Sequence, residues 1–176
     1  MTILQTDRLR LEPFADHHFE GLHAIDSDPE VMRYISGKPD TREDTAAGMA
    51  RVKARWAEWG YSWWAFIEKD SGQVIGSGCI QHLGRDKAKP LEIGWRLRRD
   101  RWHQGFASEA AQVMAAFAFD TLRTPQLCAV CHPDNKGSAR VMERLGMSYR
   151  GSERWYEMDT SVYEISRSDW QIRTGT

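Results

Sequence analysis

The sequence predicts a single domain of mixed α/β fold, in which helices cover both faces of a central sheet. Three observations support this fold class. The chain has 176 residues, which is the size of one domain. Segments with strand-like alternation are interspersed with segments of helical periodicity. Their order is strand, three helices, three strands, helix, strand, helix and two strands, which is typical of a mixed sheet with helices on both sides.

The first half of the chain predicts one strand followed by helices. Residues 6–13 alternate apolar and polar side chains, as in a half-buried strand. Helical spacing over residues 16–35 is broken at Asp28, which is suited to cap a second helix because proline follows it. Residues 41–44 form the start of a third helix, and Gly60 ends it.

The second half predicts further strands and helices, which complete the order given above. Residues rich in β-formers indicate strands at 62–68, 73–82, 90–97 and 126–132, and two more within 147–166. Apolar residues at helical spacing indicate helices at 107–122 and 135–145.

Composition and charge argue against several classes of protein. The 24 lysines and arginines nearly balance the 25 acidic residues, so no broad positive field favours nucleic acid. No apolar run approaches the ~18 residues of a membrane span, and residues 1–7 lack the pattern of a signal peptide. The three cysteines suit a reducing compartment. We therefore expect a cytoplasmic protein with neither nucleic acid nor membrane as a partner.

The segment of residues 91–110 carries the strongest signal for chemistry. It predicts a strand, a tight loop and the start of a long helix, with Gly105 where a side chain would collide. The unpaired amides of the first helical turn, about residues 104–108, form an anion site that suits a pyrophosphate. The segment lacks the glycine spacing of dinucleotide-binding folds and of phosphate loops. An ordinary strand-to-helix connection is the equal alternative.

Short motifs in a fixed order resemble one superfamily. The strand reads Glu-Ile-Gly-Trp at 92–95, and the loop reads Trp-His-Gln-Gly-Phe-Ala-Ser-Glu-Ala at 102–110. Further matching segments are 6–11, 28–34, 74–76, Asn135 with Ser138, and 145–147. Together they resemble the GNAT acetyltransferase superfamily, and most closely its branch of ribosomal-protein N-terminal (alanine or serine) acetyltransferases. His103 departs from the pattern, which often has glycine at that position.

The resemblance implies a GNAT-like N-acetyltransferase domain over residues 6–172. Its sheet is mixed and mostly antiparallel, and two parallel strands, 92–97 and 126–132, splay apart so that acetyl-CoA inserts between them. We expect no metal. The residues expected to hold coenzyme A are strand residues beside the pantetheine arm, loop residues around the pyrophosphate and one residue of the next helix: Trp95, Arg96, Leu97, Trp102, His103, Gln104, Gly105, Phe106, Ala107, Ser108 and Asn135.

By this resemblance the chain acetylates a primary amine, of a protein N-terminus or a small molecule, by direct attack in a ternary complex. An α-amine with a pKa of ~7.7–8.0 is more easily neutralised than a lysine amine with a pKa of ~10.4. Glu92 is the candidate general base, and a surface glutamate paired with an arginine is the alternative. Ser138 is the candidate proton donor, because Met142 stands where many relatives have tyrosine; a serine bonded to the helix backbone is the alternative.

Other interpretations stay open. A catalytically idle CoA-binding sensor or interaction domain fits the missing tyrosine at Met142, and a nucleotide-binding regulator would use the same anion site. The Cys-x-x-Cys-His run at 128–132 matches redox, zinc and haem patterns. On a strand, residues three apart point to opposite faces ~10 Å apart, so we expect none of these sites.

The acceptor side has few signals of its own. Residues 28–36 are expected to close over the acceptor, and some of Trp63, Trp64 and Trp95 to line its cleft. The identity of the amine, the use of other acyl groups and the oligomeric state stay open, with a homodimer the arrangement common among superfamily members.

Overall fold

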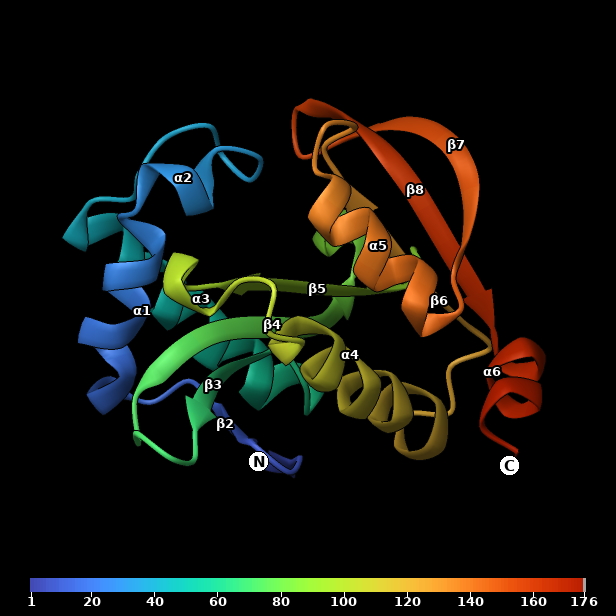
Figure 1. Cartoon of the computed structure of the whole chain (residues 1–176), viewed down its shortest axis with the longest axis horizontal. Coiled ribbons are helices and arrows are strands. Elements are labelled where there is room, and N and C mark those ends of the chain that lie inside the picture. The colour runs from blue at the N-terminus through green and yellow to red at the C-terminus, as the bar shows by residue number, and fades with distance from the viewer. Residues whose placement is uncertain (176) are drawn as a thin grey trace.

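A computed structural model describes residues 1–175 and contains an eight-stranded sheet in the order β1-β2-β3-β4-β5-β6-β8-β7 (Figure 1). The strands are β1 (Leu4–Gln5), β2 (Leu9–Pro13), β3 (Trp63–Glu68), β4 (Val74–His82), β5 (Leu91–Leu97), β6 (Gln126–Cys131), β7 (Ser148–Trp155) and β8 (Met158–Ser166).

Neighbouring strands of this sheet run antiparallel, except β5 and β6, which are parallel. These two strands pair only at Leu91↔Leu127 and Glu92↔Cys128. Beyond these two pairs no register joins them, so the sheet opens along the rest of β5. The predicted mixed, mostly antiparallel sheet with a splayed parallel pair is confirmed.

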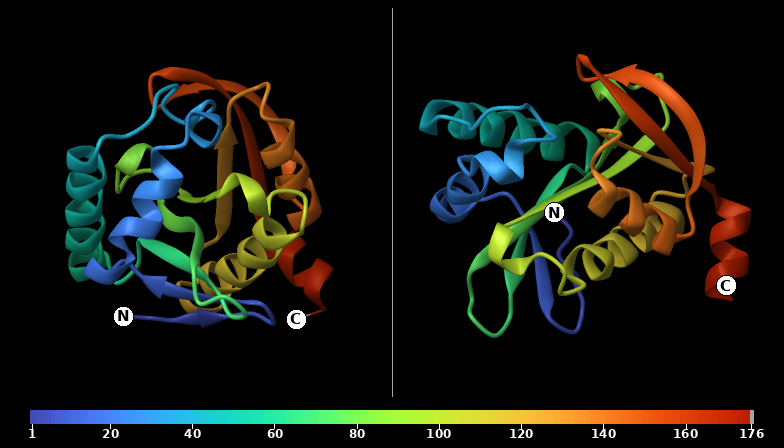
Figure 2. Two further views of the ribbon diagram at one scale, coloured as in Figure 1. Left: turned by 60° about the vertical axis from the view of Figure 1, so that its left-hand side comes forward. Right: turned by 45° about the horizontal axis from the view of Figure 1, so that its top comes forward.

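Helices cover both faces of the sheet. They are α1 (Phe19–Asp26), α2 (Pro29–Met32), α3 (Arg42–Trp59), α4 (Phe106–Ala116), α5 (Lys136–Leu145) and α6 (Arg167–Thr174). Figure 2 shows α1, α2 and α3 on one side of the sheet, and α4 and α5 on the other. Strand β3 divides the core between these layers, because Ala65 packs with Leu22 and Met49, whereas Trp64 meets Phe117 edge-on.

The capping residues identified in the sequence act as predicted. The Asp28 side chain accepts from the Glu30 amide at the start of α2. Thr41 and Asp44 form a reciprocal capping box before α3. Asn135, for which the sequence predicted a coenzyme contact and no capping role, caps α5 by accepting from the Ser138 amide. These local interactions fix where the helices begin, and hence where the loops between them lie.

Three features differ from the prediction. Strand β1 and helix α6 were not expected; β1 is only two residues long, and Ser166 caps α6 so that Trp170 stacks on Phe119. The helix expected at 107–122 changes to π-helical turns at Phe117–Thr121. Among the described residues, no helix is long and apolar enough to cross a membrane.

Candidate functional site

A cavity of about 510 Å³ lies beside the open part of β5. Its walls come from the region of α2, from β5, from the loop before α4, from the first turn of α4, and from one side of α5. It brings together Ser138 and all the predicted coenzyme residues except Gln104: Trp95, Arg96, Leu97, Trp102, His103, Gly105, Phe106, Ala107, Ser108 and Asn135. Gln104 is turned away, because its side-chain amide donates to the Asp100 carbonyl at 2.9 Å.

The alternation of β5 separates two kinds of residue. In register with β4, Trp95 and Leu97 stand opposite Gly78 and Gly76. A Cβ at Gly78 would lie 2.8 Å from the Met114 side chain, so this face of the sheet packs against α4. Glu92 and Arg96 alternate with these residues and belong to the face covered by α1–α3. The strand therefore presents different chemistry to its two sides.

The loop before α4 is held in an uncommon backbone conformation. His103 and Gly105 both have positive φ, of 59° and 82°. Glycine adopts this left-handed region freely, whereas histidine does so with strain, so the backbone at His103 is suited to the glycine that the resemblance implies there. The turn leads directly into α4, so the amides of its first turn, which have no acceptor within the helix, begin at the cavity wall.

Side chains from the first strand brace the start of α4. The Arg8 guanidinium donates to the Glu109 carboxylate at 2.7 Å and to the Gln104 carbonyl at 3.0 Å. It also lies over the Phe106 ring at 4.1 Å, and Thr6 bonds the same carboxylate. No local pattern of the sequence indicated this brace, although Arg8 and Glu109 both lie inside motifs that resemble the superfamily.

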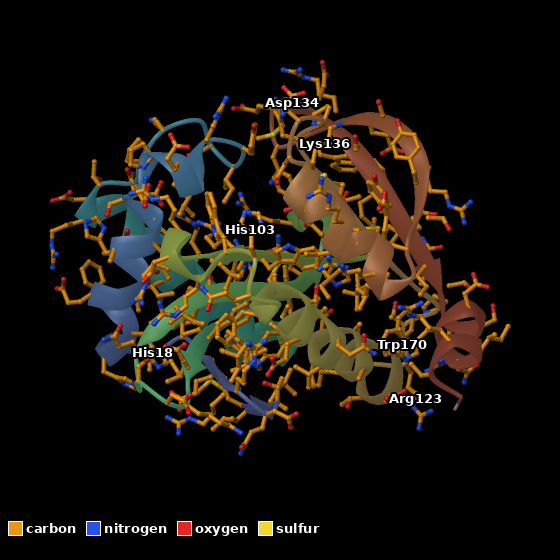
Figure 3. The ribbon with its side chains drawn as sticks, viewed as in Figure 1. His18, His103, Arg123, Asp134, Lys136 and Trp170 are labelled. Atoms are coloured by element: carbon orange, nitrogen blue, oxygen red, sulfur yellow. The ribbon has the colours of Figure 1, made fainter. Side chains whose placement is uncertain are left out.

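Polar groups of the cavity fit a phosphate-bearing ligand. The Ser108 hydroxyl is buried in the first turn of α4 and has no hydrogen-bond partner among the described residues. Lys136, Arg140 and Arg144 recur every four residues along α5 and line the same cavity, so they share one helix face. Figure 3 labels His103 before α4 and Lys136 at the start of α5. Helix amides, an unpartnered hydroxyl and cations together complement the phosphates of coenzyme A.

Glu92 does not line this cavity. Its side chain is buried, with 6% of the residue exposed, and its Oε2 accepts from the Gln81 amide at 3.2 Å and from the Tyr156 hydroxyl. Burial raises the pKa of Glu92 to about 7, while the two hydrogen bonds oppose the shift. The alternative of a surface glutamate paired with an arginine is wrong, because the carboxylate is neither exposed nor within ion-pair distance of an arginine in the described structure.

Tyr156 was missed in the sequence. It occupies the two-residue turn between β7 and β8, and both Tyr156 and Glu157 have positive φ, of 52° and 64°. Such turns favour Asn-Gly, so a Tyr-Glu pair gives no turn signal. The reach of its hydroxyl to Glu92, 64 residues away, is visible only in three dimensions.

The segment around α2 bridges the open side of the sheet. The Tyr34 ring stacks on His132 at the end of β6, with 5.2 Å between centroids. Val31, Tyr34 and Ile35 line the cavity. On the other side, the Arg96 guanidinium donates to Asp26 at 2.9 Å and lies over the Trp63 ring at 5.0 Å. These contacts fix the segment next to both β5 and β6.

Several residues considered in the sequence have structural surroundings. Trp64 is fully buried against Phe117, so it lines no cleft. Cys128 and Cys131 are buried free thiols. Met142 is buried in the core. The position at which the resemblance implies a tyrosine is therefore a packing position in this chain.

One cluster has the composition of a metal site, namely Glu12, His17 and His18. The Ala15 amide donates to His18 Nδ1 at 3.1 Å, so Nε2 carries the ring proton and donates it to Glu12 at 2.9 Å. A protonated Nε2 has no lone pair for a metal. Burial lowers the pKa of His18, which keeps this neutral tautomer. The hydrogen bond from His18 to Glu12 therefore has a structural role, because it joins the turn before α1 to β2.

The split sheet and the cavity at the start of α4 are the arrangement expected of a domain that binds a phosphate-bearing coenzyme at an open strand. A family model described as an acetyltransferase (GNAT) domain matches residues 8–148. The chain belongs to the GNAT acetyltransferase family and is an N-acetyltransferase; the family uses acetyl-CoA as the acetyl donor. The predicted superfamily is confirmed.

Relatives and solved structures agree with this assignment. The chain is 31% identical to the uncharacterized protein YkkB of Bacillus subtilis, over 93% of this chain and 95% of that one. It is 30% identical to the uncharacterized N-acetyltransferase YoaA of the same organism, over 93% and 96%. A GNAT-family acetyltransferase from Bacillus anthracis superposes with a TM-score of 0.80 at 26% identity, covering 95% of this chain and 99% of that one. RimL, a ribosomal L7/L12 α-N-protein acetyltransferase in complex with coenzyme A, shares the fold with a TM-score of 0.76 at 17% identity, over 94% and 98%.

Proposed function

We propose that this protein transfers the acetyl group of acetyl-CoA directly to a primary amine, on a protein N-terminus or a small molecule, in a ternary complex. The observation that carries the proposal is the cavity between the open edge of β5 and the first turn of α4. Acetyl-CoA supplies an activated acetyl thioester. The protein has to hold it, orient the amine and remove a proton from the attacking nitrogen.

The coenzyme is assigned to the residues that line this cavity. Among the described residues, the backbone of β5 at Trp95–Leu97 has no strand partner on the β6 side, which suits pairing with an extended amide chain. The first-turn amides of α4 and the Ser108 hydroxyl suit a pyrophosphate. Arg140 on α5 adds positive charge, and Asn135 holds the start of that helix in place.

Glu92 is assigned as the general base. A carboxylate with a pKa of about 7 is a stronger base than an ordinary glutamate and is still ionised for much of the time at neutral pH. It suits an α-amine, whose pKa of ~7.7–8.0 leaves a useful neutral fraction. Glu92 lies on the α1–α3 side of the sheet, so the amine is expected to approach from that side and to pass its proton to the carboxylate through water. Nitrogen gains the acetyl carbon as the bond from that carbon to sulfur breaks.

Ser138 is assigned as the group that returns a proton to the departing thiolate. It lines the cavity near the start of α5, and its amide, rather than its hydroxyl, bonds the Asn135 cap. Replacement of Ser138 by alanine is expected to lower turnover. Unchanged turnover would remove this role without affecting the proposed reaction.

The proposed reaction is tested by release of free coenzyme A from acetyl-CoA. The acceptors are peptides with alanine, serine or methionine N-termini, together with polyamines, aminoglycosides and amino acids. The panel spans both acceptor classes because RimL is described as an α-N-protein acetyltransferase, and a relative 26% identical is named FsC-acetyl coenzyme A-N(2)-transacetylase. Turnover on peptides alone assigns a protein N-terminus, and turnover on a small amine assigns a metabolite or drug.

A second candidate is an idle domain that binds acetyl-CoA as a sensor. One observation favours it: the position of the usual tyrosine is filled by Met142, which is buried in the core. Tight binding of acetyl-CoA without turnover on any amine of the panel would favour this candidate over the enzyme.

A further inference from the structure

We propose that Tyr156 is the positioning residue of Glu92, and that its hydroxyl holds the carboxylate in one orientation and favours its charged form. This inference rests on the proposed role of Glu92 as the base. It adds a residue from the far end of the chain to the reaction, in a hairpin that carries none of the motifs of the family resemblance.

The Tyr156 hydroxyl has a complete set of hydrogen bonds. It donates to Glu92 Oε2, and it accepts from the Gly84 amide at 3.1 Å and from Gln81 Nε2 at 3.3 Å. A tyrosine hydroxyl has one proton and two acceptor positions, so two donors directed at its oxygen leave the proton for the carboxylate. The direction of the bond to Glu92 is therefore fixed by its neighbours.

Gln81 closes the network from the other side. Its Nε2 donates to the same carboxylate oxygen at 3.2 Å, and its Oε1 accepts from the indole of Trp63 at 3.1 Å. The indole can only donate, so it fixes which end of the Gln81 amide faces Glu92. Both neighbours of the carboxylate thus present protons to it, which favours the ionised form over the protonated one.

The hairpin that carries Tyr156 is held in a strained conformation. Both residues of its turn have positive φ, which is a conformational outlier for a bulky side chain such as tyrosine. Packing holds this turn in place. Trp155 lies against Gly84, so closely that a Cβ added to Gly84 would be 3.0 Å from the indole ring. The Arg85 guanidinium lies over the Tyr156 ring, 5.6 Å from its centroid. Strain that the surroundings maintain is a feature of functional sites.

The charged and titratable groups around Glu92 come from four elements. Tyr156 lies on the β7–β8 turn, Arg85 on the loop after β4, Cys79 on β4 and Cys128 on β6. Burial and the neighbouring Glu92 raise the pKa values of the Tyr156 hydroxyl and of both thiols, so these groups stay protonated at neutral pH. The guanidinium of Arg85 places a positive charge near the carboxylate. Glu92 is therefore the member of this set that titrates near pH 7.

The test is the pH dependence of kcat/KM for the best amine of the panel, between pH 5.5 and 9. Tyr156→Phe keeps the ring and its packing and removes the proton donor. In Tyr156→Phe, the acidic limb of the kcat/KM profile is expected to move up by about one pH unit. The value of kcat/KM at pH 6 should then fall about tenfold, while the value at pH 9 stays near that of the wild type. Tyr149→Phe makes the same change on an exposed tyrosine of the same hairpin, and its profile is expected to match the wild type.

A second variant shifts the limb in the opposite direction. Incorporation of 3,5-difluorotyrosine at position 156 makes the hydroxyl a stronger donor and keeps the fold, so the acidic limb is expected to move to lower pH. A purely structural tyrosine gives no such opposed shifts. If both variants at position 156 keep the acidic limb of the wild-type kcat/KM profile while Glu92→Gln is inactive, the proposed role of Tyr156 is overturned and that of Glu92 stands. Full activity of Glu92→Gln would instead overturn the proposed base, and this inference with it.

Discussion

At the scale of single residues, Glu92 shows a conflict between stability and chemistry. A buried carboxylate that forms no ion pair among the described residues is unfavourable in its charged form, and its pKa of about 7 expresses that cost. The folded protein binds a proton at Glu92 between about pH 4.5 and 7, where an unfolded chain has released it. Stability therefore falls as pH rises through this window, and the loss is complete above pH 7.

Glu92→Gln removes this charge and should separate its effect on stability from its effect on turnover. Turnover is expected to fall by about 10²–10⁴-fold, because a positioned base is lost, and the remaining rate should lack the acidic limb near pH 7. At pH 8 the variant is expected to be more stable than the wild type by up to about 3 kcal/mol, and the gap should narrow toward pH 5. Urea unfolding at both pH values measures the gap. An equal difference at pH 5 and pH 8 would contradict a titrating Glu92.

At the scale of elements, the cavity depends on how α4 begins. Two left-handed residues, His103 and Gly105, turn the chain so that the helix starts at the cavity wall. The brace from Arg8 to Glu109 then fixes the first turn against the N-terminal strand. A change at Gly105 should therefore disturb coenzyme binding through the backbone, without removing any side-chain contact.

Gly105→Ala tests this dependence on backbone conformation. The change is expected to cost about 1–2 kcal/mol of stability, because alanine at a φ of 82° is strained, and to raise KM for acetyl-CoA several-fold as the amides shift. Gly48→Ala is the matched control in the middle of α3, where a Cβ meets only the end of the Arg51 side chain at 3.8 Å. It should stabilise the protein by about 0.5–1 kcal/mol and leave KM unchanged. An unaltered KM in Gly105→Ala would show that the amides do not hold the coenzyme.

The elements also show what the sequence could predict and what it could not. Capping residues such as Asp28 and Thr41 act within a few positions along the chain, so the starts of their helices were located correctly. The splay of β5 from β6 followed from the resemblance of motifs and was confirmed. The contact of Tyr156 with Glu92 depends on a turn whose residues contradict the usual turn preferences, so no local pattern indicated it.

At the scale of the whole molecule, two halves of the sheet meet along the line where β5 leaves β6. The backbone pairs them at only two positions, and side chains supply other contacts across the line. Tyr34 stacks on His132 near the end of β6, and Tyr156 bonds Glu92 on β5 from the outer hairpin. A coenzyme that pairs with β5 and contacts α5 would add a further connection between the halves.

Acetyl-CoA should therefore stabilise the whole fold and not only order one loop. At a concentration 100 times its dissociation constant, binding to the folded state contributes about 2.7 kcal/mol, which corresponds to a rise in Tm of about 5–11 °C for a chain of this size.

Arg140→Gln removes one cation of the cavity and should reduce the rise in Tm at a fixed ligand concentration, most clearly at low salt. Arg150→Gln makes the same change on β7, at a residue outside the cavity lining, and should keep the full rise. Differential scanning fluorimetry across a titration of acetyl-CoA measures all three proteins. Equal rises in Tm in Arg140→Gln and Arg150→Gln would show that the cations of α5 do not contact the coenzyme, because an unspecific effect of charge would act on both positions alike.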